Sequence, residues 1–296
     1  MAHPLGELAL LVPPRDAVAP AELAVLESAL RDREVASHRT TLGKDPATTV
    51  RAELARGTRL LVHCGGQDSM LDVAAALLRD GRHEPADAVL GVFPGDRTNE
   101  FAMTFGLARA PEGAAEILTS DRLMHVDVGV ATYGDTRRYV FNDAVVGVEA
   151  RVYQLAARLR AGRLGGLASW WLSTATYRRR STTVEMSTAS WTGRAVQVRV
   201  ANGQFAIDRL QVAPLALPDD GRWDVQVWDG PRHLPFTLQP QMLRGEHLPH
   251  EHVTEWRQSR VVVTSTRPTP VAIDGRYVGR TPVTFELLPK ALRLKV

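Results

Sequence analysis

Two adjacent glycines, Gly65 and Gly66, stand where a short apolar run changes into a helical pattern. The run over 60–64 is typical of a buried strand, and apolar residues recur at helical spacing over 70–77. A strand, turn and helix in an α/β sheet bring backbone N–H groups and a helix N-terminus to the carboxyl edge of the strands, which favours a phosphate group there. Glycine also serves tight packing or a positive φ, so a phosphate site and a packed turn both stay open.

The elements that must position this turn alternate between strand and helix through the first 120 residues. Strands that alternate with helices predict a parallel sheet with helices on both faces. The expected strands are 7–12, 34–41, 60–64 and 88–93, and the expected helices are 20–31, 45–56, one starting at Ser69, and 99–105.

After about residue 121 the pattern becomes that of an antiparallel β structure. Alternating β-branched residues fill 123–152 and 182–294, and turn-forming residues interrupt them. One helix, 150–160 continuing as 167–177, is expected within this region. We therefore predict an α/β domain over 1–121, an antiparallel all-β domain, sandwich or barrel, over 122–285, and a C-terminal segment, 286–296, that returns to the first domain.

The composition is that of a globular protein, with 296 residues, 23% of them charged, and a formal net charge of +3. So mild a positive charge does not by itself indicate a nucleic-acid partner, and none is expected. Cys64 is the only cysteine, which predicts a buried structural thiol rather than a nucleophile, and a reducing cytoplasm. The sequence has no apolar run long enough to span a membrane, and its first residues do not resemble a signal peptide. We therefore expect a soluble protein, cytoplasmic or peripheral at the membrane.

Six segments carry a resemblance to one family: GGQDSMLDV (65–73), PGDRTNEFA (94–102), VDVG (126–129), FNDAVVGVEA (141–150), APLALPDDGRWD (213–224) and DGRYVGRTPVTFELLPKALRL (274–294). In content and order they resemble motifs of the bacterial diacylglycerol kinase, or lipid kinase, family, which includes sphingosine and ceramide kinases and is related to NAD kinases. The resemblance implies an NAD-kinase-like α/β domain followed by an antiparallel β domain.

The resemblance also implies a transferase of phospholipid metabolism, which uses ATP and Mg²⁺ to phosphorylate a hydroxyl of a lipid or lipid-like molecule. It assigns Asp274 as the general base and Asp127 to the metal network. It also implies that Asp220, together with the backbones of Leu217 and Arg222, could hold a structural Mg²⁺, although an ordinary Asp-Gly turn stays open as the alternative. The residues it brings to the nucleotide are Gly65, Gly66, Gln67, Asp68, Ser69, Arg97, Thr98 and Asn99.

Four segments near the implied nucleotide site depart from the family pattern. Gln67 stands where the family has Asp, and Arg276 where it has Glu. Asp96-Arg97 replaces a Gly-Thr pair, and the residues at 12–16 replace the N-terminal NPxSG motif. Neither a neutral amide nor a fixed positive charge serves as an anionic partner for Mg²⁺. Arg97 and Arg276 could bind an anionic group directly, or they are surface arginines on turns.

Two functions therefore stay open. The first is ATP-dependent phosphoryl transfer through a modified site. The second is a catalytically inactive pseudokinase that binds a lipid or an anion, or that uses its β domain to bind another protein, including a second copy of itself as a homodimer.

Two further stretches have two interpretations each. Trp170, Trp171 and Leu172, followed by the basic run 178–180, predict a helix packed in the core, with a membrane-facing helix as the alternative. The histidines over 247–252 have spacing that could hold a metal, but Pro249 favours an exposed loop.

Overall fold

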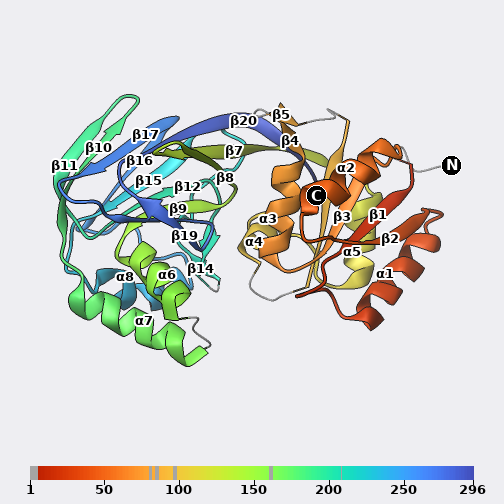
Figure 1. Cartoon of the computed structure of the whole chain (residues 1–296), viewed down its shortest axis with the longest axis horizontal. Coiled ribbons are helices and arrows are strands. Elements are labelled where there is room, and N and C mark those ends of the chain that lie inside the picture. The colour runs from red at the N-terminus through yellow and green to blue at the C-terminus, as the bar shows by residue number, and fades with distance from the viewer. Residues whose placement is uncertain (1–5, 80–81, 84–86, 96–98, 160–162, 208) are drawn as a thin grey trace. The chain divides into compact units, whose positions relative to one another are not determined.

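The computed structural model describes residues 6–79, 82–83, 87–95, 99–159, 163–207 and 209–296 (Figure 1). The chain divides into two compact units, each described below by itself. Unit 1 runs to Asp127 and includes Pro289–Val296, and unit 2 is Val128–Leu288. Among the described residues, no helix is both long and apolar enough to cross a membrane.

Unit 1 is built on a parallel sheet with the strand order β2-β1-β3-β6. Its strands are β1 (Leu8–Val12), β2 (Ser37–Thr41), β3 (Leu60–Gly65) and β6 (Val89–Pro94). Every residue of β3 and β6 is buried, as expected for central parallel strands that are covered on both faces. The C-terminal strand β20 (Val283–Lys295) adds a parallel contact to β6, with Leu294 beside Leu90.

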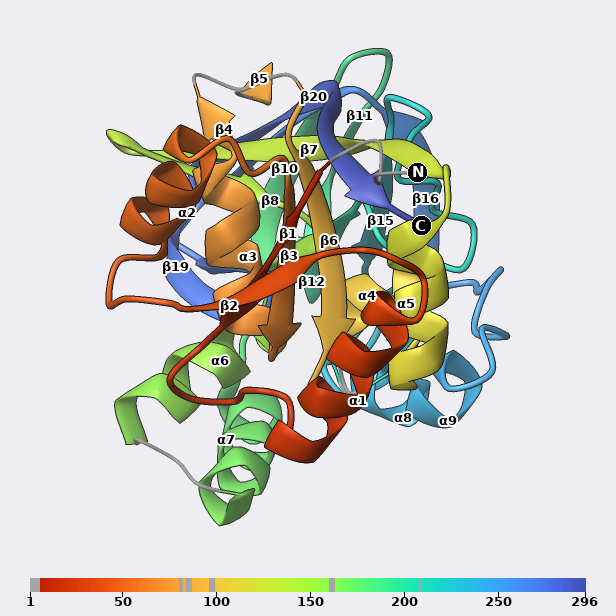
Figure 2. The same ribbon diagram turned by 90° about the vertical axis from the view of Figure 1, so that its right-hand side faces the viewer.

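Helices flank this sheet, with α1 and α5 on one side and α2 and α3 on the other (Figure 2). They are α1 (Pro20–Arg31), α2 (Pro46–Ala55), α3 (Gln67–Ala76), α4 (Glu100–Thr104) and α5 (Pro111–Thr119), and two-residue strands β4 (Leu78–Arg79) and β5 (Arg82–His83) follow α3. The predicted alternation is confirmed. Helix α5 was not predicted; its apolar residues Ala114, Ala115 and Leu118 are buried within nine residues, too short a segment for a clear periodic signal.

Unit 2 contains antiparallel strands, which confirms the predicted all-β class. They are β7 (Leu123–Tyr133), which enters from unit 1, β8 (Thr136–Val140), β9 (Asp143–Gly147), β10 (Arg180–Met186), β11 (Ser190–Ala195), β12 (Gln197–Ala201), β13 (Phe205–Ala206), β14 (Leu210–Gln211), β15 (Trp223–Trp228), β16 (Val253–Gln258), β17 (Arg260–Ser265), β18 (Pro270–Ile273), β19 (Arg276–Arg280) and the first part of β20. One sheet of unit 2 has the strand order β16-β15-β12-β9-β18-β19. The other contains the neighbouring strands β11-β10-β17-β20.

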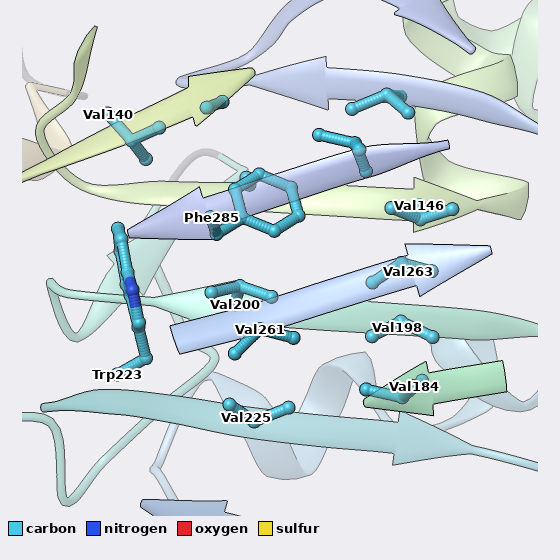
Figure 3. Close-up of a cluster of buried hydrophobic side chains, with 14 of the residues drawn as sticks. Val140, Val146, Val184, Val198, Val200, Trp223, Val225, Val261, Val263 and Phe285 are labelled. Atoms are coloured by element: carbon cyan, nitrogen blue, oxygen red, sulfur yellow. The ribbon is translucent and has the colours of Figure 1, made fainter. Parts of the chain in front are cut away.

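The core of unit 2 lies between these two sheets (Figure 3). Val146, Val198 and Val225 come from the first sheet, while Val263 and Phe285 come from the second, and all five are buried. Alternate residues of each strand thus point to the core, as the period-two pattern predicts for a sandwich.

Two longer helices, α6 (Val148–Leu159) and α7 (Arg163–Thr176), pack against each other in unit 2. The prediction of a single helical interruption is wrong, because α8 (Leu234–Thr237) and α9 (Gln239–Met242) are also present. Each has only four residues, which is too short for helical periodicity to be visible in the sequence.

The expected core packing of the tandem tryptophans is correct for only one of them. The Trp170 ring packs edge-on against Phe236 at a centroid distance of 4.4 Å, whereas Trp171 and Leu172 are exposed. The reason is the orientation of α7, which turns Ser169 and Ser173 inward.

Candidate active site

The glycine turn after β3 lies where the carboxyl ends of three parallel strands meet. The Gly66 N–H donates to the Asp16 carbonyl after β1 at 2.8 Å, and the Gly95 N–H, after β6, donates to the Gly65 carbonyl at 3.0 Å. A Cβ on Gly65 would lie 2.5 Å from Pro13 Cγ and 2.9 Å from the Asp16 carbonyl oxygen. Close packing of the chain therefore accounts for glycine at position 65.

Ser69, in the first turn of α3, makes hydrogen bonds within the protein. Its Oγ lies 2.8 Å from His63 Nε2 and donates to the Gly66 carbonyl at 3.3 Å. Burial lowers the pKa of His63 to about 3, so this imidazole is neutral. Asp68, next to Ser69 in the sequence, is exposed. Its negative charge in the first turn of α3 interacts favourably with the helix dipole, and it would repel a second anion bound at the same place. The sequence analysis missed His63, although it is a polar residue in an otherwise apolar strand.

Gln67 and Asn99 both accept hydrogen bonds at the start of α4. The Gln67 Oε1 accepts the Phe101 N–H at 3.1 Å, and the Asn99 Oδ1 accepts the Ala102 N–H at 2.8 Å. Asn99 is buried, and its Nδ2 donor has no partner among the described residues. The structure therefore brings together the glycine turn, Gln67 and Asn99, whereas the predicted site residues Arg97 and Thr98 lie outside the described residues.

Asp127 is fully buried at the end of unit 1. Its Oδ1 accepts the backbone N–H of Lys290 at 2.7 Å, and this bond holds the C-terminal segment as it enters unit 1. Lys290 has a φ of 54°, which is uncommon for a residue other than glycine and marks a local irregularity within β20. Within the part of the chain that the structure describes, no three His, Cys, Asp or Glu residues are grouped so that they could hold a metal ion.

Asp274 occupies the turn between β18 and β19 in unit 2. Its Oδ1 accepts the backbone N–H groups of Asn142 at 2.8 Å and Asp143 at 3.0 Å, and its Oδ2 accepts that of Phe141 at 3.1 Å. The Asp274 N–H in turn donates to the Asp143 carbonyl at 2.8 Å. The carboxylate is thereby fixed against the turn between β8 and β9.

Electrostatics keep the Asp274 carboxyl near its titration point at neutral pH. Burial raises its pKa to about 7, and the nearby Asp143 raises it as well, while the three N–H donors lower it. A carboxyl group with a pKa near 7 can both accept and release a proton at physiological pH.

A buried charge cluster lies next to Asp274. Arg199 on β12 donates hydrogen bonds to the carboxylates of Asp143 and Glu149, and Gln197 Nε2 donates to Glu149 Oε2 at 3.1 Å. Burial raises the pKa of Glu149 to about 7 and also raises that of Asp143. The sequence analysis missed this cluster. The available signal was the placement of three charged residues, Asp143, Glu149 and Arg199, within runs of apolar residues.

Comparison with known proteins identifies the family. The model of the diacylglycerol kinase catalytic domain matches residues 17–131, and that of the YegS C-terminal NAD kinase beta sandwich-like domain matches residues 143–296. The chain belongs to the bacterial lipid kinase family.

Individual members of the family are similar to the chain over nearly its whole length. A protein named "Probable lipid kinase YegS-like" from Citrobacter koseri is 24% identical over 273 residues, covering 90% of this chain and 88% of the relative. A protein of the same name from Serratia proteamaculans is 24% identical over 281 residues, covering 93% and 89%. The crystal structure of a diacylglycerol kinase from Bacillus anthracis str. Sterne matches with a TM-score of 0.71 and 17% identity, covering 98% of this chain and 96% of the other.

Arg276 and Asp220, two further positions compared with the lipid kinase family, lie in separate parts of unit 2. Arg276 is half-buried and begins β19, two residues after Asp274. The Asp220 Oδ1 accepts the Arg222 N–H at 2.9 Å, and the Asp220 N–H donates to the Leu217 carbonyl at 3.5 Å. Asp220 therefore stabilises its own turn through local hydrogen bonds.

The histidine stretch differs from the exposed loop that was predicted. His247 is buried, its ring stacks on Trp228 at 6.1 Å, and its Nε2 lies 3.2 Å from the Val212 carbonyl oxygen. Burial lowers the pKa of His247 to about 4, so the ring is neutral. Packing against Trp228 explains why this histidine points inward, which its polar neighbours in the sequence did not indicate.

Proposed function

We propose that this chain is an ATP-dependent kinase that phosphorylates a hydroxyl of a lipid or lipid-like molecule through a modified site. Asp274 is the general base: it accepts the hydroxyl proton as the oxygen attacks the γ-phosphorus of ATP, while the bond from that phosphorus to the β–γ bridging oxygen breaks and ADP leaves. The observation that carries the proposal is the Asp274 carboxylate, held by three backbone N–H groups with a pKa raised to about 7.

The nucleotide would be held at the turn after β3. The residues proposed for this role are Gly65, Gly66, Gln67, Asp68, Ser69, Arg97, Thr98 and Asn99. The Asn99 Nδ2 donor, which lacks a partner among the described residues, supports a polar ligand here.

The family's magnesium site fits the described residues poorly. Gln67 offers a neutral oxygen that already accepts the Phe101 N–H, and the described residues contain no metal-binding group of three. We propose that the always-charged guanidinium of Arg276 neutralises phosphate in place of a metal ion. Asp127 and Asp220 remain the proposed positions should Mg²⁺ bind.

The test is transfer of radiolabelled phosphate from ATP to diacylglycerol in detergent micelles, with and without Mg²⁺. Asp274→Asn is expected to lower the rate by about a hundredfold or more, since general base catalysis contributes on that order. Asp135→Asn, in the exposed turn between β7 and β8, is the matched control and keeps the wild-type rate. Wild-type turnover by folded Asp274→Asn protein would contradict the assignment.

A second candidate is a pseudokinase that binds a lipid or an anion without transfer. It is favoured by the three backbone hydrogen bonds that the Asp274 oxygens accept and by the hydrogen bond from Phe101 N–H to Gln67. Calorimetric titration with ATP separates the two candidates, since the kinase binds ATP and the pseudokinase does not. In the second case, Gln67→Asp combined with Arg276→Glu is expected to create magnesium-dependent ATP binding that the natural chain lacks.

A further inference from the structure

Helix α7 of unit 2 is inverted with respect to a normal surface helix. Ser169 and Ser173 are 0% exposed, while Trp171 is 78% exposed and Leu172 is 47% exposed. A surface helix of a soluble protein ordinarily turns its large apolar residues inward and its polar residues to water. The exposed side of α7 therefore has large apolar side chains that the described residues leave uncovered.

The outward side of α7 forms one continuous apolar stripe. It consists of the exposed residues Ala168, Trp171, Leu172 and Ala175, which we call the α7 stripe. Their spacing of three, one and three residues puts them on one face of the helix.

The opposite side of α7 is held by the protein. The Trp170 ring on this side packs against Phe236 of α8 at 4.4 Å. At the end of the helix, Arg151 of α6 donates to the Oγ1 of the exposed Thr176 at 3.0 Å. Figure 1 shows α6 and α8 next to α7, below the strands of the same unit. These contacts fix which side of α7 faces outward.

The sequence that follows Glu149 in α6 and runs to just beyond α7 carries charge of one sign. Residues 150–184 contain no Asp or Glu, and they contain seven arginines, at 151, 158, 160, 163, 178, 179 and 180. Arg158 on α6 and Arg178 just beyond α7 are exposed. An exposed tryptophan in a segment that contains arginines and no Asp or Glu suits the boundary between lipid headgroups and acyl chains.

We propose that the α7 stripe is a docking surface for an anionic lipid bilayer. Trp171 and Leu172 enter the boundary between headgroups and acyl chains, and Arg158 and Arg178 contact the lipid phosphates. The area of one helical stripe is small compared with the roughly 800 Å² that each partner buries in a stable protein interface. A bilayer, in contrast, needs no complementary shape, so we choose it as the partner. The proposal does not rest on phosphoryl transfer, because binding to the bilayer requires no nucleotide.

The test is co-sedimentation of the full chain, without nucleotide, with vesicles of phosphatidylcholine alone and with vesicles that also contain phosphatidylglycerol. We expect binding to the anionic vesicles, and Trp171→Ser combined with Leu172→Ser is expected to weaken it about tenfold or more. The matched control combines Leu215→Ser with Leu243→Ser, which removes leucines outside α7 that are 68% and 62% exposed. This control keeps wild-type binding.

A second variant tests the charge separately. Arg158→Gln combined with Arg178→Gln is expected to weaken binding to the anionic vesicles severalfold while leaving binding to phosphatidylcholine unchanged. Thermal unfolding of each variant verifies that these surface changes leave the fold intact.

Three results would overturn the proposal. The first is absence of wild-type binding to anionic vesicles, and the second is equal binding by the wild type and the Trp171/Leu172 variant. The third is a lipid-free dimer, detected by light scattering, that this variant dissociates, because the stripe would then be covered by a second copy of the chain.

Discussion

Asp274 and Asn142 are joined by a hydrogen bond of 2.8 Å from the Asn142 backbone N–H to the Asp274 Oδ1. The proposed base is therefore also a structural acceptor that ties the β18–β19 turn to the β8–β9 turn. Because one carboxyl group would serve both roles, activity and stability must be measured side by side in every Asp274 variant.

The raised pKa of Asp274 predicts a specific pH dependence of stability. Its value of about 7 in the folded protein lies above the ordinary 3.8, so the folded state holds this proton at pH values where the unfolded chain has lost it. The resulting stabilisation is fully present below pH 3.8 and is lost as the pH rises to about 7. Relative to Asp274→Asn, the free energy of unfolding of the wild type is expected to fall by a few kcal/mol over this interval.

Urea unfolding of both proteins at a series of pH values between about 5 and about 8 measures this difference. Asp135→Asn is the control, and its curve is expected to run parallel to that of the wild type. A gap between wild type and Asp274→Asn that is the same at every pH would contradict the assigned shift.

The packing of Gly65 predicts that even one added methyl group is destabilising. In Gly65→Ala, the new Cβ meets Pro13 Cγ at 2.5 Å and the Asp16 carbonyl at 2.9 Å, so the turn must shift. We expect a loss of about 2 kcal/mol or more in the free energy of unfolding. Gly43→Ala is the matched control, since its nearest contact would be an ordinary 3.6 Å to Thr49 Oγ1, and equal effects of the two changes would refute the packing explanation.

The fold could be predicted where local signals and tertiary structure agree. Proline at the first turn and apolar periodicity marked α1 and α2 to within a residue of their observed ends. The short helices α8 and α9 gave no such signal, because tertiary packing around buried residues such as Leu234 and Met242 holds them in place.

The candidate site was only partly accessible from the sequence. The motifs indicated Asp274 and Gln67 as site residues. Both accept hydrogen bonds from backbone N–H groups of distant segments, and a local sequence pattern does not encode such contacts. The cluster of Arg199 with Asp143 and Glu149 joins residues about fifty positions apart, so it became visible only in the folded chain.

Cys64 is expected to be unreactive in the folded protein. The thiol is buried in β3, and burial raises its pKa far above the ordinary value, so the reactive thiolate is scarce. A thiol reagent with a chromogenic leaving group should react negligibly with native protein and completely in denaturant. Rapid labelling of native protein would show that β3 is accessible. That result would contradict the interpretation of Cys64 as a structural thiol.

The buried charge cluster predicts a large difference between two arginine substitutions. Arg199→Ala leaves the buried carboxylates of Asp143 and Glu149 without their guanidinium partner, and it is expected to lower the free energy of unfolding by about 3 kcal/mol or more. Arg260→Ala removes an exposed ion pair to Glu286, with Nε and Oε1 3.4 Å apart, and should cost less than about 1 kcal/mol. Denaturant unfolding at neutral pH compares the two variants. Lowering the pH should restore part of the stability of Arg199→Ala, because protonation neutralises the unpartnered carboxyl groups. If the stability of this variant instead continues to fall on acidification, the buried cluster is not the cause of the loss.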